Sequence, residues 1–183
     1  MFMMDIPPKK ITADKSVQKA MAKWPDVPEC FGWLSLNRRA EWSIKGEKIH
    51  HKNTRRFLQR NYNFDNLGRW FVQNGPQRAF VSLEYTPRLY GFSSSAGFYI
   101  HDEAEIPPSL DFFLDEYGNL LLSTGLGVGV VDDRDLSAIS DLIETVNDIP
   151  IELNYREKSY RIKPIVKALV PKHFGFIQNP RQI

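Results

Sequence analysis

Apolar and polar residues alternate over several short stretches of this chain, and glycine, proline or asparagine interrupts the alternation between them. Alternation with a period of two is typical of a strand that buries one face, and the interrupting residues are typical of turns. Val, Phe, Trp and Tyr are frequent in these stretches, which favours strands over helices. The pattern predicts paired strands over residues 33–49, 70–85, 111–131 and 149–162.

Helical spacing of apolar residues occurs in fewer places. Val17, Ala20, Met21 and Trp24 recur at i, i+3, i+4 and i+7, which predicts an amphipathic helix that starts after Thr12 and ends at Pro25. Three more helices are predicted: residues 52–60 with Asn53 as N-cap, a longer helix from Asp135 through Val146, and a short one over Pro164 to Val170.

Two seventeen-residue stretches share their turn residues. DNLGRWFVQNGPQRAFV at 65–81 and DEYGNLLLSTGLGVGVV at 115–131 align Asp65 with Asp115, Gly68 with Gly118, Gly75 with Gly125 and Val81 with Val131. An Asp followed three residues later by Gly suits a tight turn that leads into a hairpin. Residues 37–40, NRRA, form a third and less complete instance, with Ala40 in place of glycine. Genuine structural repetition and unrelated hairpins with the same turn chemistry both explain the match.

These elements together predict an α+β fold. We expect short antiparallel strands in two abutting subdomains, a repeated turn-hairpin motif, and three or four helices. The predicted organisation is an N-terminal helical extension over 1–24, a first α+β subdomain over 25–105 and a second over 106–183.

Charge is distributed unevenly along the 183 residues. Residues 1–60 hold 13 Lys and Arg against 6 Asp and Glu, whereas residues 101–157 hold 2 basic residues against 14 acidic ones. Such segregation provides either a basic face for an anionic partner or two oppositely charged halves of one fold. Cys30 is the only cysteine, and we found neither a signal-peptide core nor a long apolar run, so we predict a cytoplasmic protein.

Several familiar chemistries lack their motifs. The glycine run GLGVGVV at 125–131 has neither the dinucleotide-loop nor the P-loop spacing. No G-x-S-x-G motif occurs, His50 and His51 are adjacent and point apart, and His101 and His173 lie far from them in sequence. We therefore predict no catalytic residue, no metal site and no cofactor.

One cluster of polar residues is a candidate ligand site. It lies on the predicted hairpin RWFVQNGPQRAFVSLEYTP, where Gln77 and Arg78 next to a Gly-Pro turn offer directed donors for a carboxylate or phosphate. The alternative is a structural ion pair between Arg78 and Glu84 across the strands. The predicted ligand-binding residues are Arg69, Asn74, Gln77, Arg78, Glu84 and Tyr85.

Residues 42–87 carry W-x-x-x-G-x-x-I, D-x-x-G-R-W-F-V and L-E-Y-T-P, and residues 115–118 carry a second D-x-x-G. Through Trp42, Gly46, Ile49, Glu84 and Pro87, this arrangement resembles an uncharacterised family of bacterial cytoplasmic proteins that is classed only as a domain of unknown function. Ala40, Lys48 and residues 74–76 depart from the family pattern. The resemblance implies an α+β fold of repeated structural motifs and a role in signalling, and it implies no catalytic residues.

Three functional hypotheses follow. The first is a non-enzymatic binding or regulatory protein that engages a protein or a small anionic ligand. The second is nucleic-acid binding through the basic segment 38–60, where basic side chains could contact phosphates and Trp33, Trp42 or Trp70 could stack on bases. The third is an enzyme whose carboxylates are assembled from both halves of the chain, which requires a pocket that contains a perturbed acid. Oligomeric state is not predicted.

Overall fold

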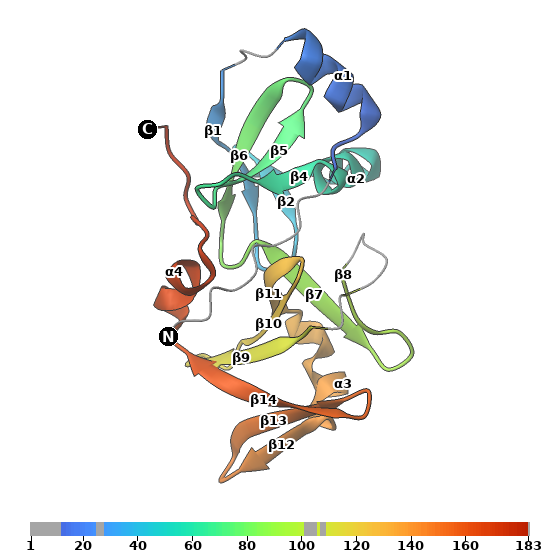
Figure 1. Cartoon of the computed structure of the whole chain (residues 1–183), viewed down its shortest axis with the longest axis vertical. Coiled ribbons are helices and arrows are strands. Elements are labelled where there is room, and N and C mark those ends of the chain that lie inside the picture. Colours follow the sequence, from blue (N-terminus) through green and yellow to red (C-terminus); the bar gives the residue numbers. More distant parts are fainter. Residues whose placement is uncertain (1–11, 25–27, 101–105, 107–108, 183) are drawn as a thin grey trace. The chain divides into compact units, whose positions relative to one another are not determined.

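The structure is a computed structural model that describes residues 12–24, 28–100, 106 and 109–182. Its helices and strands form two compact units (Figure 1). The N-terminal unit comprises residues 12–87 together with 175–182, and the inserted unit comprises Arg88–Phe174. The chain therefore leaves the N-terminal unit after Pro87 and returns to it at Gly175.

A six-stranded sheet forms the N-terminal unit, in the order β3-β2-β1-β6-β5-β4. Neighbouring strands are antiparallel except for β1 and β6, which are parallel. The tail extends this unit, because Ile177 N–H donates to Gly68 O at 2.9 Å and Leu83 N–H donates to Gln178 O at 2.8 Å. The strands are β1 (Cys30–Leu36), β2 (Trp42–Ile44), β3 (Glu47–Lys48), β4 (Tyr62–Phe64), β5 (Trp70–Asn74) and β6 (Gln77–Leu83).

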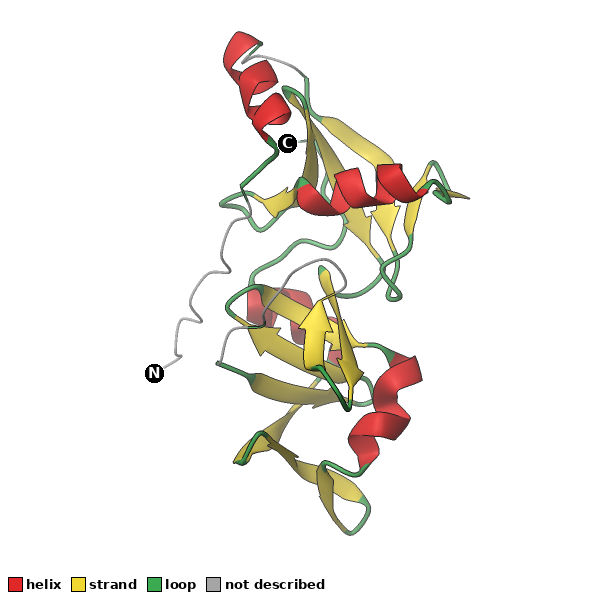
Figure 2. Ribbon diagram, turned by 90° about the vertical axis from the view of Figure 1, so that its right-hand side faces the viewer, coloured by secondary structure: helices red, strands yellow, loops and turns green. Residues whose placement is uncertain are grey.

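Two helices accompany this sheet, α1 (Lys15–Lys23) and α2 (Lys52–Arg60). Figure 2 shows α2 crossing the sheet, and it contacts β5. Only Val17 of α1 and Leu58 of α2 are buried, so each helix attaches through a narrow apolar stripe. An aromatic cluster of Trp42, Tyr62 and Trp70 fills the core beside them, with ring centroids 4.8–5.1 Å apart.

The inserted unit contains an eight-stranded sheet in the order β12-β13-β14-β9-β10-β11-β7-β8. The pairs β14–β9 and β11–β7 are parallel and the others antiparallel. Its strands are β7 (Arg88–Ser93), β8 (Gly97–Ile100), β9 (Asp111–Asp115), β10 (Leu120–Thr124), β11 (Gly127–Val131), β12 (Ile143–Val146), β13 (Ile149–Tyr155) and β14 (Lys158–Ile165). The helical segments are η1 (Asp133–Asp135), α3 (Leu136–Ser140), η2 (Lys167–Leu169) and α4 (Val170–Phe174).

One hydrophobic core holds the inserted unit together. Ile139 of α3 is fully buried in it, and Tyr90 reaches across β11 to place its hydroxyl 2.8 Å from Thr124 Oγ1 and 2.7 Å from Gly127 O. Gly129 provides the space, because a side chain there would lie 2.6 Å from the Tyr90 ring. The buried core residues are Tyr90, Phe92, Phe98, Phe112, Leu120, Leu122, Val131, Ile139, Leu153 and Ile162.

The same five-residue loop occurs three times. We call these the Asn37 loop (37–41), the Asp65 loop (65–69) and the Asp115 loop (115–119). In each, Oδ1 of the first residue accepts the backbone N–H groups of the third and fifth residues at 2.8–3.0 Å. The first and fifth residues also exchange a side-chain bond, and the backbone N–H of the fourth donates to the carbonyl of the first. The repetition predicted from the two Asp-x-x-Gly stretches and from residues 37–40 is confirmed.

Each loop joins the first two strands of a three-stranded antiparallel meander, namely β1–β2–β3, β4–β5–β6 and β9–β10–β11. The fourth loop residue has a left-handed backbone in all three cases, with φ of 55° at Ala40, 75° at Gly68 and 78° at Gly118. The hairpin turns that follow are less alike: φ is +58° at Gly75, whereas in the second hairpin the positive φ of 110° falls on Gly127 rather than Gly125. The repeated unit is thus the loop with its meander.

The α+β class is confirmed, and several details of the prediction are corrected. The sheets are mixed rather than wholly antiparallel, because β1–β6, β14–β9 and β11–β7 are parallel pairs. The helix predicted from Asp135 through Val146 ends at Ser140, and Ile143–Val146 form β12. Pro164 lies in β14, with the short helix after it, and His51 rather than Asn53 is the N-cap of α2.

Candidate functional site

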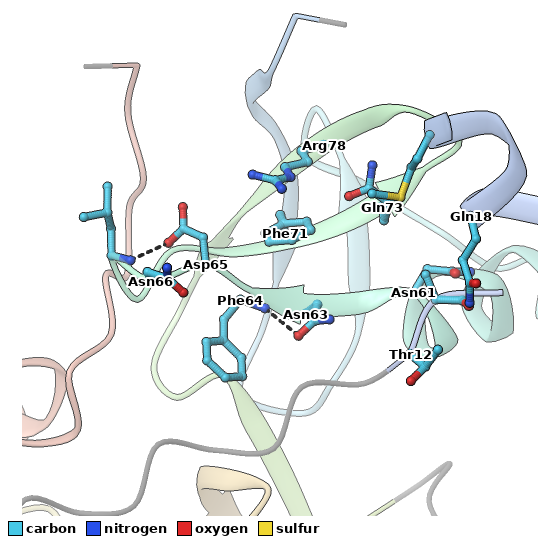
Figure 3. A pocket seen from close by; sticks show the side chains of 13 residues that line it. Thr12, Gln18, Asn61, Asn63, Phe64, Asp65, Asn66, Phe71, Gln73 and Arg78 are labelled. Carbon is cyan, nitrogen blue, oxygen red and sulfur yellow. Dashed lines mark hydrogen bonds between the residues drawn. The ribbon is translucent and has the colours of Figure 1, made fainter. Parts of the chain in front are cut away.

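Polar side chains gather on one face of the N-terminal sheet, across β4, β5 and β6. Asn63 pairs in register with Phe71, and Gln73 pairs with Arg78. Asn61 precedes β4 and its carbonyl accepts the N–H of Gln73 at 3.0 Å. Since side chains of paired residues lie on the same face of a sheet, these five side chains point to one side (Figure 3).

A pocket of about 560 Å³ lies over this face. Gln18 and Met21 of α1 border it from one side, and the Asp65 loop borders it from the other. Amide side chains make up much of the lining, and Arg78 is the one basic residue among the described lining residues. The lining residues are Thr12, Ala13, Gln18, Met21, Asn61, Asn63, Phe64, Asp65, Asn66, Leu67, Phe71, Gln73 and Arg78.

Arg78 is held by stacking rather than by a tight ion pair. Its guanidinium carbon lies 4.9 Å from the centroid of the Phe71 ring, a cation–π contact. Its nearest carboxylate oxygen is Oε1 of Glu29, at 3.8 Å from Nη1. The side chain remains 41% exposed. Arg78 therefore keeps donors available on the pocket side while the aromatic ring fixes its position.

Arg69 is engaged within the protein instead. Its Nε donates to Asp65 Oδ2 at 2.7 Å, its Nη2 lies 3.8 Å from Glu29 Oε2, and its guanidinium carbon lies 4.4 Å from the Phe80 ring centroid. The side chain is only 11% exposed. Arg69 thus closes the Asp65 loop and shares Glu29 with Arg78.

The other predicted ligand-binding residues do not line the pocket. Asn74 is exposed at the end of β5, and Gln77 donates through Nε2 to Pro28 O at 3.3 Å. Glu84 accepts the N–H of Arg38 at 3.1 Å, and Tyr85 is buried. The alternative ion pair between Arg78 and Glu84 is wrong, because Arg78 faces Glu29.

The Asp65 carboxylate is stabilised in its ionised form. Burial raises the pKa of this carboxyl, but hydrogen bonds from the backbone and side chain of Arg69 and from Leu67 N–H outweigh that effect and lower the pKa below its usual value. The pocket thus contains one compensated anion, Asp65, and one accessible cation, Arg78. Because its hydrogen-bond donors compensate the charge of Asp65, this carboxylate would repel an anion bound at Arg78 only weakly.

Sequence reasoning missed most of the pocket. Asn61 also holds the start of α1, since its Oδ1 accepts the N–H of Asp14 at 3.0 Å. Asn61 and Asn63 flank the buried Tyr62, so the polar alternation of β4 was the available signal. Nothing in sequence connects this strand to Gln18, because the two are brought together by the packing of α1.

The basic segment 38–60 is also solvent-exposed in part. Lys45 Nζ lies 3.9 Å from the ring centroid of Trp33, which is 53% exposed. Arg55 and Arg56 are exposed on α2 and form no ion pair with any described residue, whereas Arg60 pairs with Asp14 at 3.3 Å.

Neither a metal-binding cluster nor a membrane-spanning helix occurs among the described residues. They contain no group of three or more His, Cys, Asp or Glu side chains arranged to hold a metal ion. His101 lies outside the described residues. No described helix is both long and apolar enough to cross a bilayer.

Comparison with known proteins places the chain in a family. The model of a family described as "Protein of unknown function (DUF2946)" matches residues 13–181, nearly the whole chain. The chain belongs to the DUF2946 family. No curated protein matches it.

A solved structure supports the fold. A DUF1285 family protein from Silicibacter pomeroyi DSS-3 is similar with a TM-score of 0.55 at 11% sequence identity, over 83% of this chain and 96% of that one. At this identity the likeness concerns the fold alone. Neither comparison supports the signalling role implied by the sequence resemblance.

Proposed function

We propose that this protein binds, without transforming it, a small ligand that carries a carboxylate or phosphate group, in the pocket over β4, β5 and β6. The observation that carries the proposal is the Arg78 guanidinium, stacked 4.9 Å from the Phe71 ring and still 41% exposed. A planar guanidinium offers a fork of donors that matches two oxygens of a carboxylate or phosphate.

The remaining lining supports this chemistry. Amide groups can both donate and accept hydrogen bonds. Those of Asn61 and Gln73 are buried and bonded within the protein, so the amides of Asn63 and Asn66 would serve the polar part of such a ligand. Met21, Leu67 and Phe64 add apolar surface for the rest of it. A volume of about 560 Å³ lies in the usual range of about 300–1,000 Å³ for small-molecule pockets.

Carboxyl chemistry supports binding over catalysis. A carboxylic acid that donates a proton at neutral pH needs a raised pKa. The pKa values of Asp14, Glu41, Asp65 and Asp132 are all lowered by hydrogen bonds. The one that lines the pocket, Asp65, is an ionised structural group of its loop.

The test is an anion screen by thermal shift, with inorganic phosphate and citrate as the first probes, followed by calorimetry. Arg78→Gln should weaken binding of an anion that stabilises the wild type by about tenfold or more, about 1.4 kcal/mol. Arg181→Gln is the matched control, since Arg181 is exposed in the same unit but does not line the pocket. Equal affinity of the wild type and Arg78→Gln would refute the proposal.

Nucleic-acid binding is a second candidate. It is supported by the exposed Trp33 next to Lys45 and by the exposed Arg55 and Arg56, whereas Trp42 and Trp70 are buried and could not stack on bases. Proteins bind single-stranded nucleic acid by stacking bases on aromatic side chains and by contacting phosphates with basic side chains. Anisotropy with a fluorescent single-stranded oligonucleotide should show affinity that falls steeply with salt and drops in Arg55→Gln/Arg56→Gln. Affinity that does not depend on salt would count against this candidate.

A further inference from the structure

Glu29 lies between Arg69 and Arg78. Its Oε1 is 3.8 Å from Nη1 of Arg78, and its Oε2 is 3.8 Å from Nη2 of Arg69. Both separations are longer than a hydrogen bond, so each contact is an ion pair without a direct hydrogen bond. The Glu29 side chain is 37% exposed, and ion pairs between exposed side chains are weak. Glu29 therefore offsets the charge of Arg78 without occupying its hydrogen-bond donors.

The backbone on both sides of Glu29 is anchored to β6. Pro28 O accepts a hydrogen bond from the Gln77 side chain at 3.3 Å. Cys30 begins β1 and pairs in register with Ala79. Gln77 and Ala79 are the two neighbours of the pocket's arginine in β6. The position of the Glu29 carboxylate beside that arginine is therefore fixed by the fold.

These contacts balance the charge next to the pocket. Arg69 and Arg78 contribute two positive charges, and Asp65 and Glu29 contribute two negative ones. The Asp65 carboxylate accepts hydrogen bonds from its own loop, including one from Arg69 Nε. Glu29 is therefore the less compensated of the two carboxylates, and its charge opposes the binding of an anion at Arg78.

We infer that Glu29 is a specificity-determining residue of the pocket, which selects against doubly charged phosphate groups in favour of singly charged carboxylates. The inference rests on the proposed function, because it concerns the group that Arg78 binds. When a ligand pairs with Arg78, Glu29 keeps Arg69 as its counter-ion and repels the ligand in proportion to the ligand's charge. At the same position, this repulsion is about twice as strong for a dianion as for a monoanion.

The probes are benzoate and phenyl phosphate, which share an aromatic ring and differ in their anionic group. At about pH 8 benzoate carries one negative charge and phenyl phosphate carries about two, because the second pKa of such a phosphate is about 6. Calorimetry gives their dissociation constants for the wild type and for Glu29→Gln. Loss of the Glu29 charge should tighten binding of benzoate about threefold and binding of phenyl phosphate about tenfold.

Glu47→Gln is the matched control. Glu47 is exposed in β3, at the opposite edge of the sheet from β4, and it does not line the pocket. This variant makes the same change in net charge and should leave both dissociation constants unchanged. Arg78→Gln reports on the proposed function itself and should weaken binding of both probes. Thermal denaturation checks that each variant is folded.

Equal tightening of both probes in Glu29→Gln, or tightening of neither, would overturn the inference. The proposed function would still stand in that case if Arg78→Gln weakened binding. The same tightening in Glu47→Gln would also overturn the inference, since the effect would then come from net charge alone. Failure of both probes to bind the wild type and Glu29→Gln would overturn it as well, and the proposed function would fall with it only if the anion screen found no ligand either.

Discussion

Asp65 and Asp115, which lie in different units of the chain, hold their loops with the same set of hydrogen bonds. In both, Oδ1 accepts two backbone N–H groups at 2.9–3.0 Å, and Oδ2 accepts a side-chain donor four residues later at 2.7 Å. In the Asn37 loop the side-chain bond has the reverse polarity: Asn37 Nδ2 donates to Glu41. The loop therefore needs complementary groups at its first and fifth positions rather than a fixed residue pair.

We expect Asp115→Ala to lower the free energy of unfolding by about 2–3 kcal/mol, because it leaves two backbone N–H groups and the buried Asn119 amide without their acceptor. Chemical denaturation measures the change. Asp141→Ala is the control, since Asp141 is an exposed carboxylate of the same unit. A change below about 0.5 kcal/mol in Asp115→Ala, within the range of ordinary surface substitutions, would show that water replaces the lost acceptor.

Gly68→Ala should destabilise the protein more than Gly118→Ala, although the two glycines hold equivalent loop positions. Both have φ near +75°, so an added Cβ strains each backbone by about 1 kcal/mol. At Gly68 the new Cβ would also lie 2.1 Å from Gly175 O, whereas at Gly118 it meets nothing within 4 Å. Melting temperatures of the two variants test this, and equal losses would mean that the tail moves away at no cost.

Acid pH should lower the free energy of unfolding through Asp132, the residue before η1. Hydrogen bonds from the Arg134 side chain, together with its backbone N–H and its charge, lower the pKa of Asp132 to about 2. A lowered folded-state pKa contributes stability that is present above the unfolded value of about 3.9 and is lost as pH falls toward 2. The wild type should lose about 1–2 kcal/mol more than Asp132→Asn between these limits. The free energy of unfolding of both proteins is measured by urea denaturation at several pH values in this range. Equal losses in the two proteins would contradict the assignment.

Alkaline pH should lower the free energy of unfolding through Tyr90. Burial raises the pKa of this phenol to about 12, so its neutral form is favoured in the folded state. The stability this contributes is complete below pH of about 10 and is lost as pH rises through about 12. Tyr90→Phe should remove that dependence and cost about 1–2 kcal/mol at neutral pH, because Thr124 and the Gly127 carbonyl lose a buried partner. Tyr117→Phe, at an exposed position, should retain the wild-type profile.

Local turn chemistry made much of the fold predictable. Asp and Gly at fixed spacing defined the loops, and β-favouring residues between turn residues defined β5, β6, β13 and β14. The β7 strand escaped notice because RLYGF is buried on both faces and shows no alternation. The false helix through Val146 arose because Ile143 and Val146 fit a helical stripe, whereas pairing with β13 determines their actual conformation.

The candidate site was less predictable than the fold. Arg78 could be singled out because it follows a Gly-Pro turn, yet its partners Glu29 and Phe71 depend on the parallel β1–β6 pairing and on strand register. Arg69 looked equally available in sequence, but its loop and Phe80 engage it. Contacts between residues that are far apart in the chain leave no local pattern in the amino-acid sequence.

The order in which a ribosome makes this chain has a consequence for the N-terminal unit. Its strands β1 to β6 emerge before the inserted unit, yet Gly68 O and Leu83 N–H bond to Ile177 and Gln178. Those residues are synthesised after the whole of Arg88–Phe174. The N-terminal unit therefore starts to leave the ribosome before the inserted unit and is completed after it, and a nascent chain that stopped before residue 177 would lack the partners of Gly68 O and Leu83 N–H.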